Sequence, residues 1–408
     1  MLDLRKQRIE DRGQRTDKRA RRAVTLIELL VVVSIMMMLA AFALPKLGPM
    51  AKQRKIREAS RSVSVFLSRA RSRAIETGRP CGVVFHRVSD DNTNPLSKAV
   101  SMLYQAEVPP PYAGNTSGAA MKLLQHAGAN DTVYLQAQIQ ATSLSNGLVR
   151  RGDRIQLNGQ GPWYEIIARP LALPPYTDLV LDGNDFIKFV DSTYTVNPTT
   201  GLITSHFLTL RWVGSPGCVS PWPAGSPSAP VPFKILRQPV RTIAQPLTLP
   251  VGTTVDLSAS GTSQNAMLFY TGKNDVTIMF SPNGSVGRYY WDDGVAPYNV
   301  DATDPIYLLI GWREQVGGPG AITQWPDLST TDTPDEETLA NWQVLTNLWV
   351  TLIPQSGLVS TSDMSHSDKA YNDVKQPPLD AQPYETRTSY MINASRQYAR
   401  QASMKGGR

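Results

Sequence analysis

A single apolar run near the N-terminus constrains this chain more than any other feature. Residues 24–44, VTLIELLVVVSIMMMLAAFAL, contain one charged side chain, Glu28, and end against Pro45. At about 1.5 Å rise per residue, a helix of this length spans roughly 30 Å, the thickness of the hydrocarbon core of a bilayer. Soluble core helices rarely need so long an apolar run, so the sequence predicts a single membrane span over residues 24–44.

Basic segments flank this run on both sides. Residues 1–23 hold nine Lys/Arg against four Asp/Glu, and residues 46–79 hold ten against two. The formal net charge of the whole chain is +7, so the rest of the chain is net acidic. Nucleic-acid binding normally needs a basic face with interleaved aromatic residues on the folded domain. The charge distribution therefore argues against a nucleic-acid partner. Because Lys and Arg normally mark the cytoplasmic side of a span and both flanks are basic here, charge alone leaves the orientation of the span open.

Glu28 is an unusual residue for a membrane helix. By insertion scales a carboxylate costs about 2.5–3.5 kcal/mol near the bilayer centre and less near an end, so it normally has a partner. Residues 24–44 contain no Lys, Arg or His. The simplest partner is therefore a second molecule. The alternatives are that Glu28 reaches the lipid headgroups or is protonated.

The order of basic segment, small residue, Thr-Leu-Ile-Glu-Leu and apolar run resembles the N-terminus of type IV pilins and type II secretion pseudopilins. The resemblance implies that a prepilin peptidase removes residues 1–23 as a leader, cutting between Ala23 and Val24 and methylating Val24. The residues that the peptidase would recognise are Thr25, Leu26, Ile27 and Leu29. In this family the glutamate of the motif meets the freed N-terminal amine of a neighbouring subunit, which assigns an assembly role to Glu28.

Two positions depart from the usual pattern of the family. The family has Gly before the cut and usually Phe after it, whereas this chain has Ala23 and Val24. Because Ala is the smallest replacement for Gly, the site remains compatible with cleavage. The resemblance further implies a bacterial inner-membrane location, a periplasmic ectodomain, and other pilins or pseudopilins as partners.

Residues 45–79 have the pattern of an amphipathic helical stem. Pro45 and Gly48-Pro49 predict a kink or melted turn at its start, and Gly78 is a natural helix end. Apolar residues recur at helical spacing and predict a stripe that packs on the sheet of the ectodomain, comprising Ile56, Ala59, Val63, Phe66, Leu67, Ala70, Ala74 and Ile75. The run SRARSRAIETGRP, followed by a strand, resembles H-type minor pseudopilins in particular.

Residues 80–364 predict a β-rich ectodomain, enlarged by an insertion around residues 109–232. Runs with β patterning predict strands at residues 81–88, 99–108, 132–141, 179–190, 206–213, 233–236, 253–257, 266–270, 276–280, 306–312 and 348–353. Asn158-Gly159 predicts the turn of a hairpin between residues 153–157 and 164–167. Residues 365–408 have the composition of a polar linker and C-terminal tail, in which residues 384–404 could form a short helix or stay disordered.

The motif search predicts no active site, no metal site and no cofactor. The four histidines are scattered, and P-loop, zinc and nucleophile-elbow motifs are missing from the sequence. Three Asp/Asn clusters, beginning at Asp90, Asp182 and Asp292, lack the alternating ligand pattern of a calcium loop and have the composition of ordinary turns. Cys81 and Cys218 are the only cysteines. An oxidising periplasm would permit a disulfide between them, and the alternative is two free thiols.

These observations predict an α+β protein in which a long N-terminal membrane-spanning helix carries an enlarged, sandwich-like β ectodomain. The function implied by the resemblance is structural: a minor pilin or pseudopilin that is processed by prepilin peptidase and joins a periplasmic fibre of a type II secretion or type IV pilus machine. A permanently anchored envelope protein that binds carbohydrate or protein is the main alternative. A membrane-tethered hydrolase is a third, because catalytic groups can converge from distant loops.

Overall fold

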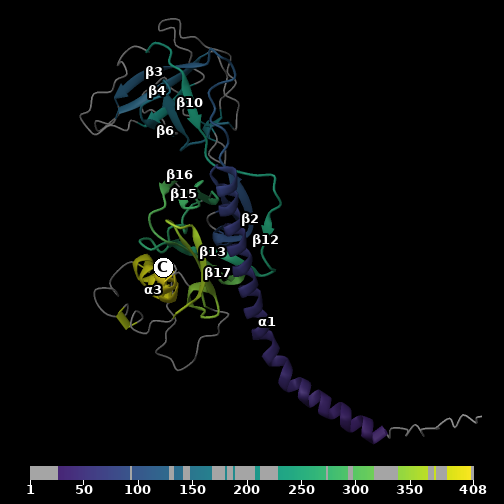
Figure 1. Ribbon diagram of the computed structural model, residues 1–408. Helices are drawn as coiled ribbons and strands as arrows, with labels where there is room; N and C mark the ends of the chain where they lie inside the picture. The colour runs from purple at the N-terminus through teal and green to yellow at the C-terminus, as the bar shows by residue number, and fades with distance from the viewer. Residues whose placement is uncertain are drawn as a thin grey trace, which may run out of the picture. The chain divides into compact units, whose positions relative to one another are not determined.

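The computed structural model contains long and short helices and extensive antiparallel sheet (Figure 1). It describes residues 26–91, 94–127, 133–140, 148–167, 180–181, 187–188, 207–211, 228–272, 274–292, 297–316, 339–365, 372–373 and 384–405. The chain divides into two compact units, residues 1–52 and residues 53–408. The first helix contributes residues to both units.

Helix α1 (Leu26–Thr77) is one continuous element of 52 residues. The predicted melted turn at Pro45 and Gly48-Pro49 is wrong, because the helix runs through both positions. Each proline removes only one backbone donor, and the bonds of the neighbouring turns continue the helix past it. The predicted end is confirmed: Gly78 has φ 62°, and an added Cβ would meet no atom within 4 Å. The positive φ, rather than lack of space, favours glycine there.

Within the second unit, α1 packs through the predicted apolar stripe. Seven of its members are buried: Ile56, Ala59, Val63, Phe66, Leu67, Ala70 and Ala74. Ile75 is the exception, with 49% of its surface exposed. The buried residues share one hydrophobic cluster with Val83 of β1 and Ile278 of β14. The stripe therefore packs on the sheet of the protein itself.

The main sheet has eleven strands, and all of its pairings are antiparallel. Its principal order is β16-β15-β14-β1-β2-β13-β17-β18-β19, and two short strands, β11 and β12, pair with β2. The strand bounds are β1 Cys81–Arg87, β2 Ala99–Glu107, β11 Val240–Arg241, β12 Leu247–Thr248, β13 Thr253–Thr262, β14 Val276–Phe280, β15 Val286–Asp292, β16 Pro297–Asp301, β17 Ile306–Trp312, β18 Leu348–Ile353 and β19 Leu358–Asp363. Short 3-10 turns lie at Pro95–Lys98 (η1), Arg313–Gln315 (η3) and Asn341–Gln343 (η5).

The two faces of the strands β13, β17 and β18 bury different partners. In β17, Leu308 joins the cluster that contains α1, whereas Tyr307 and Leu309 join a second cluster. That second cluster includes Met391 of α3 (Tyr384–Ser395) and Ala399 of α4 (Gln397–Lys405). The expected mixture of helix and sheet is present, but these strands lie between helices rather than face to face with a second sheet.

A buried arginine secures the C-terminal helices. Arg396, between α3 and α4, is fully buried and donates to the backbone carbonyls of Ala259, Thr262 and Ala266 at 2.8–2.9 Å. Its guanidinium also lies over the rings of Tyr307 and Trp349, at 4.7 and 4.9 Å from their centroids. Burial lowers the pKa of Arg396 to about 9. The helical alternative predicted for residues 384–404 is thus confirmed, as two helices joined by a residue that forms part of the core.

Two glycine turns lie directly against α1. Gly284 follows β14 with φ 84°, and its carbonyl accepts from Arg71 Nε at 3.0 Å. A Cβ on Gly284 would come within 2.8 Å of the Ile75 side chain. Gly357, in the turn before β19, has φ 62°, and an added Cβ would clash with the Gly284 carbonyl oxygen and come within 2.9 Å of Arg71 Nε. Both positions therefore need glycine for backbone angle and for space.

The insertion forms a second sheet with its own core. Six strands have the order β10-β5-β6-β9-β4-β3, and β3, β4, β6 and β10 are labelled together in Figure 1. Their bounds are β3 Ala120–Ala127, β4 Val133–Gln140, β5 Arg154–Leu157, β6 Trp163–Ile167, β9 Phe207–Arg211 and β10 Phe233–Leu236, and β7 (Val180–Leu181) pairs separately with β8 (Ile187–Lys188). Met121, Leu123, Ile155, Ile166 and Ile235 are fully buried in one cluster. The inserted residues thus bury apolar surface among themselves.

Most of the predicted strands are present, and the hairpin turn is confirmed. Asn158 and Gly159 have φ values of 56° and 66°, as a tight turn between β5 and β6 requires. The strand predicted at residues 266–270 is wrong, because these residues form a turn in which Ala266 and Phe269 are buried. Apolar residues in a buried turn have the same composition as a short strand, so the pattern alone could not separate the two.

Asp153 is a buried carboxylate at the start of the second sheet. It is 1% exposed and accepts from the backbone N–H groups of Arg150 at 2.7 Å and Gln238 at 2.9 Å. Burial raises the pKa of Asp153 to about 7, although these two hydrogen bonds oppose the shift. Asp153 connects the loop before β5 to the segment after β10.

We predict that Arg396→Met destabilises the packing of α3 and α4 on the sheet. Methionine fills part of the space but leaves three buried carbonyls without donors, which should lower the free energy of unfolding by about 3 kcal/mol. Urea unfolding followed by tryptophan fluorescence measures the loss. Arg400→Met is the matched control, because Arg400 is half-buried and donates to the Asn393 side chain. Equal losses for the two variants would contradict the proposed contribution of Arg396.

We predict that Asp153 makes stability depend on pH in an unusual direction. The pKa of the folded carboxyl is about 7, whereas the pKa of an unperturbed aspartate is 3.8. Between these values the folded protein binds more protons than the unfolded chain, so this site lowers stability as pH rises, by up to about 1.4 kcal/mol per pH unit. Asp153→Asn should reduce this dependence in urea unfolding from pH 5 to 8, and the exposed Asp90→Asn should not. An unchanged slope in Asp153→Asn would contradict the assignment.

Candidate functional site

The first turns of α1 expose apolar side chains on every side. Residues 26–39 are all exposed, including Leu26 at 81%, Ile27 at 70% and Met36 at 67%. A helix that is apolar all round normally lies inside a protein core or a membrane. Exposure of this surface to water is unfavourable in proportion to its area. This segment therefore has the character of a contact surface for an apolar environment.

Only two polar side chains interrupt this surface between residues 26 and 39. Ser34 donates its hydroxyl to the carbonyl of Leu30 at 2.6 Å, so its polar group is satisfied within the helix. Glu28 lies in the first turn of α1 and is exposed. A negative charge there is favoured by the positive end of the helix dipole. Glu28 is thus the charged group at the beginning of the apolar segment.

The predicted processing residues lie at the edge of the described structure. Ala23, Val24 and Thr25 are outside the described residues, so their structure does not test the predicted cut. Leu26, Ile27 and Leu29 of the recognition motif are exposed in the first turn of the helix. Across the portions of the chain that are described, no helix has both the length and the apolar character required for a membrane span.

Cys81 is the first residue of β1 and a free, buried thiol. Its sulfur lies 3.7 Å from the hydroxyl of Thr77 at the end of α1. Cys218, its predicted partner, is outside the described residues. The disulfide between Cys81 and Cys218 therefore stays a prediction.

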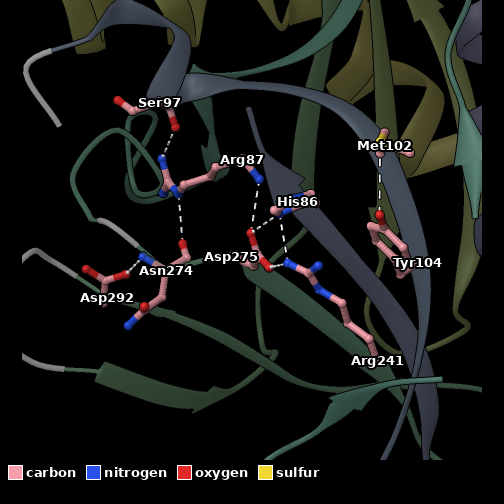
Figure 2. A network of polar contacts seen from close by, with 9 residues as sticks. All are labelled: His86, Arg87, Ser97, Met102, Tyr104, Arg241, Asn274, Asp275 and Asp292. Carbon is pink, nitrogen blue, oxygen red and sulfur yellow. Dashed lines mark hydrogen bonds and ion pairs between the residues drawn. The ribbon is translucent and has the colours of Figure 1, made fainter. Parts of the chain in front are cut away.

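Figure 2 shows a cluster of titratable side chains at the junction of β1, β2 and β11. The Asp275 carboxylate accepts from the backbone N–H of Arg87 at 3.0 Å and from the Arg241 guanidinium. His86 Nδ1 lies 3.0 Å from Asp275 Oδ1 and 2.8 Å from an Arg241 amino nitrogen. The neutral ring nitrogen can accept from Arg241 and the protonated one can donate to Asp275, so the two contacts alternate with the protonation of Nδ1.

The electrostatics of this cluster indicate a structural role, in which charged side chains link neighbouring strands. Burial raises the pKa of Asp275, but hydrogen bonds from His86 and Arg241 outweigh it and hold the pKa below its usual value. The Arg241 guanidinium also lies 4.7 Å from the centroid of the Tyr104 ring, above β2. An ionised Asp275 held by three donors is a poor proton acceptor for catalysis. The geometry therefore fastens β11 to the neighbouring strands.

Arg87, in the same view, is a second buried arginine held by carbonyls. It is 1% exposed and donates to the carbonyl oxygens of Ser97 at 2.9 Å, Asn274 at 2.8 Å and Phe269 at 3.1 Å. Burial lowers its pKa, although Asp292 and Asp275 act in the opposite direction. Arg87 joins two connections at one end of β1, the one between β1 and β2 and the one between β13 and β14. Among the residues that are described, no three His, Cys, Asp or Glu side chains gather in a metal-binding group.

Sequence reasoning missed the buried charged residues of the ectodomain. Asp153 and Arg396 sit among polar stretches whose composition is that of solvated segments, and Arg87 ends an apolar strand where a solvated side chain would be expected. These residues can be recognised only in the folded structure, where backbone carbonyls or N–H groups from other segments surround one side chain. By contrast, the site residues at the N-terminus were visible from their order in the sequence.

Comparison with known proteins gives one match. Residues 18–44 match the Prokaryotic N-terminal methylation motif, which includes the predicted cut and Glu28. Neither the curated proteins nor the solved structures contain a significant match to this chain. The matched residues are those of the basic segment and the beginning of α1. The match supports a place for this chain in the type IV pilin and pseudopilin superfamily.

Proposed function

We propose that this protein is a minor pilin or pseudopilin, a structural subunit without enzymatic activity that joins a periplasmic fibre. The observation that carries the proposal is the methylation motif at residues 18–44, placed at the start of a long helix whose first turns are exposed and apolar. A prepilin peptidase cuts between Ala23 and Val24 and methylates Val24. The apolar segment then anchors the chain in the bacterial inner membrane before it enters the fibre.

The ectodomain supports this proposal through its connection to the helix. The stem of α1 is part of the hydrophobic core, so the folded domain and the helix move as one subunit from residue 56 onward. The stem sequence favours an H-type minor pseudopilin of a type II secretion system or its type IV pilus counterpart. Other pilins or pseudopilins are the partners, and the ectodomain lies in the periplasm.

Glu28 has the assembly role in this proposal. In the mature chain it would be four residues from the new N-terminus at Val24. In an apolar environment, a carboxylate beside the amine of a neighbouring subunit gains more than it would in water, because the local dielectric is low. This contact sets the axial register between subunits.

We predict that the residue at position 23 controls the rate of processing. Ala23→Gly restores the smallest residue and should be cut at least as fast as the natural chain, whereas Ala23→Phe should block the cut because a large side chain fills the peptidase cleft. Pulse labelling followed by gel electrophoresis separates precursor from mature chain. Arg22→Phe is the matched control, since it places the same ring one residue away. Equal processing of all variants would contradict cleavage after residue 23.

We predict that Glu28→Ala inserts normally into the membrane but fails to enter fibres. Removal of the carboxylate leaves the apolar segment intact and abolishes the ion pair with the neighbouring amine. Membrane fractionation and copurification with other pilins measure the two steps separately. Ser34→Ala is the matched control, because the Ser34 hydroxyl is satisfied within its own helix.

Copurification of Glu28→Ala at the natural level would contradict the assembly role. It would instead favour a permanently anchored envelope protein that uses the helix only as a tether. A screen of the purified protein against ester, peptide and glycoside substrates addresses a hydrolase, and turnover there would contradict a purely structural role.

A further inference from the structure

Strand β19 has one unpaired side. It lies at the end of the strand order and pairs with β18 alone among the described strands. The backbone N–H and C=O groups on its outer side are therefore available for hydrogen bonds. Such an edge is a template for an added strand unless the protein protects it. Proline and lysine, which commonly protect edges, are both missing from the LVSTSD sequence of β19.

A polar groove lies between this edge and α1. Its walls include Arg57, Ser60, Arg61 and Ser64 of α1, and Thr361 of β19. Thr361 Oγ1 is 3.3 Å from the Ser60 hydroxyl and 3.1 Å from the Ser64 hydroxyl. These hydroxyls bring the strand and the helix together while the groove beside them stays open. The last three residues of β19 line the groove, and Val65 and Leu348 add apolar surface beside the polar groups.

A second groove lies on the other face of β19. It is lined by Ser362 and Asp363 of the strand and by Tyr398, Gln401 and Lys405 of α4. The hydroxyls of Ser360 and Ser362 are shielded from solvent and lack a hydrogen-bond partner in the described part of the structure. The free edge is thus flanked by one groove on each face of the sheet.

The first groove carries a net positive charge, whereas the second has one cation, Lys405, and one acid, Asp363. Arg57 and Arg61 in the first groove, and Lys405 in the second, are exposed and have no ion-pair partner within the described residues. Asp363 is the one acid in the linings. Because the cations lie on the flanking helices rather than on the strand, they attract an acidic segment without blocking the edge. Successive side chains of an added strand point to opposite faces, and hence into the two grooves.

We propose that β19 is a docking edge for an acidic, extended segment of a partner protein, which adds to the main sheet as a further strand. Backbone hydrogen bonds to β19 hold the segment, and its carboxylates meet Arg57 and Arg61. The inference does not depend on processing of the N-terminus or on Glu28. Its failure and that of the proposed function are therefore distinguishable.

The electrostatic half of this proposal is tested with a synthetic probe. The full-length protein in neutral detergent is titrated with a fluorescent peptide in which Glu alternates with Thr. The double variant Arg57→Glu/Arg61→Glu should weaken binding by about tenfold at low salt, and Arg57→Lys/Arg61→Lys should retain it. The double variant Arg54→Glu/Lys55→Glu is the matched control, since it changes the charge of the same helix equally outside the groove. Equal weakening by both reversals would overturn the site.

The backbone half is tested by N-methylation of the same peptide. Two versions carry methyl groups on alternate amides, so that each version loses the donors along one edge of the strand. Strand addition uses one edge, so one version should bind like the parent and the other should lose at least tenfold in affinity. Amides of β19 should gain protection from hydrogen exchange only with the binding version. Equal binding by the two versions would show that the peptide binds through its charge alone, without backbone hydrogen bonds to β19, and would overturn strand addition.

Discussion

The structure depends on one helix that meets two different requirements along its length. From residue 56 onward, α1 buries a stripe of small and branched side chains against the sheet, which makes the helix part of the hydrophobic core. The apolar side chains of its first turns, residues 26–39, all remain exposed. Residues 26–39 therefore need an apolar environment outside the chain, and the proposed membrane and fibre provide one.

Buried polar groups explain how the rest of the chain is held around this helix. Arg87 and Arg396 each replace their hydration shell with backbone carbonyls from loops that are distant in sequence. A guanidinium suits this task because its donors lie in a fixed plane and it stays charged even when burial lowers its pKa. Loss of such a residue leaves several carbonyls unpaired at once. Arg396 thus adds polar contacts to the apolar cluster that α3 and α4 share with the sheet.

Local patterns predicted the regular elements because each depends on its own residues. The stripe of α1, the stop at Gly78, the Asn158-Gly159 turn and most strands follow from spacing and backbone preference. The separate core of the insertion and the docking of α3 and α4 depend on contacts between distant residues. Residues such as Arg396 gave no sequence signal, since a buried arginine and a solvated one look the same in the chain.

The site at the N-terminus was predictable for a different reason. A peptidase reads a short linear segment, so the residues it would recognise stand next to one another, from Ala23 to Leu29. The docking edge at β19 could be recognised only in the structure. Its cations come from α1 and α4, which lie far apart in the sequence and approach each other around this strand.

The exact mass of the chain isolated from its native membrane is the most direct test of the central claim. The account predicts a chain that starts at N-methylated Val24, and a chain that retains residues 1–23 would contradict it.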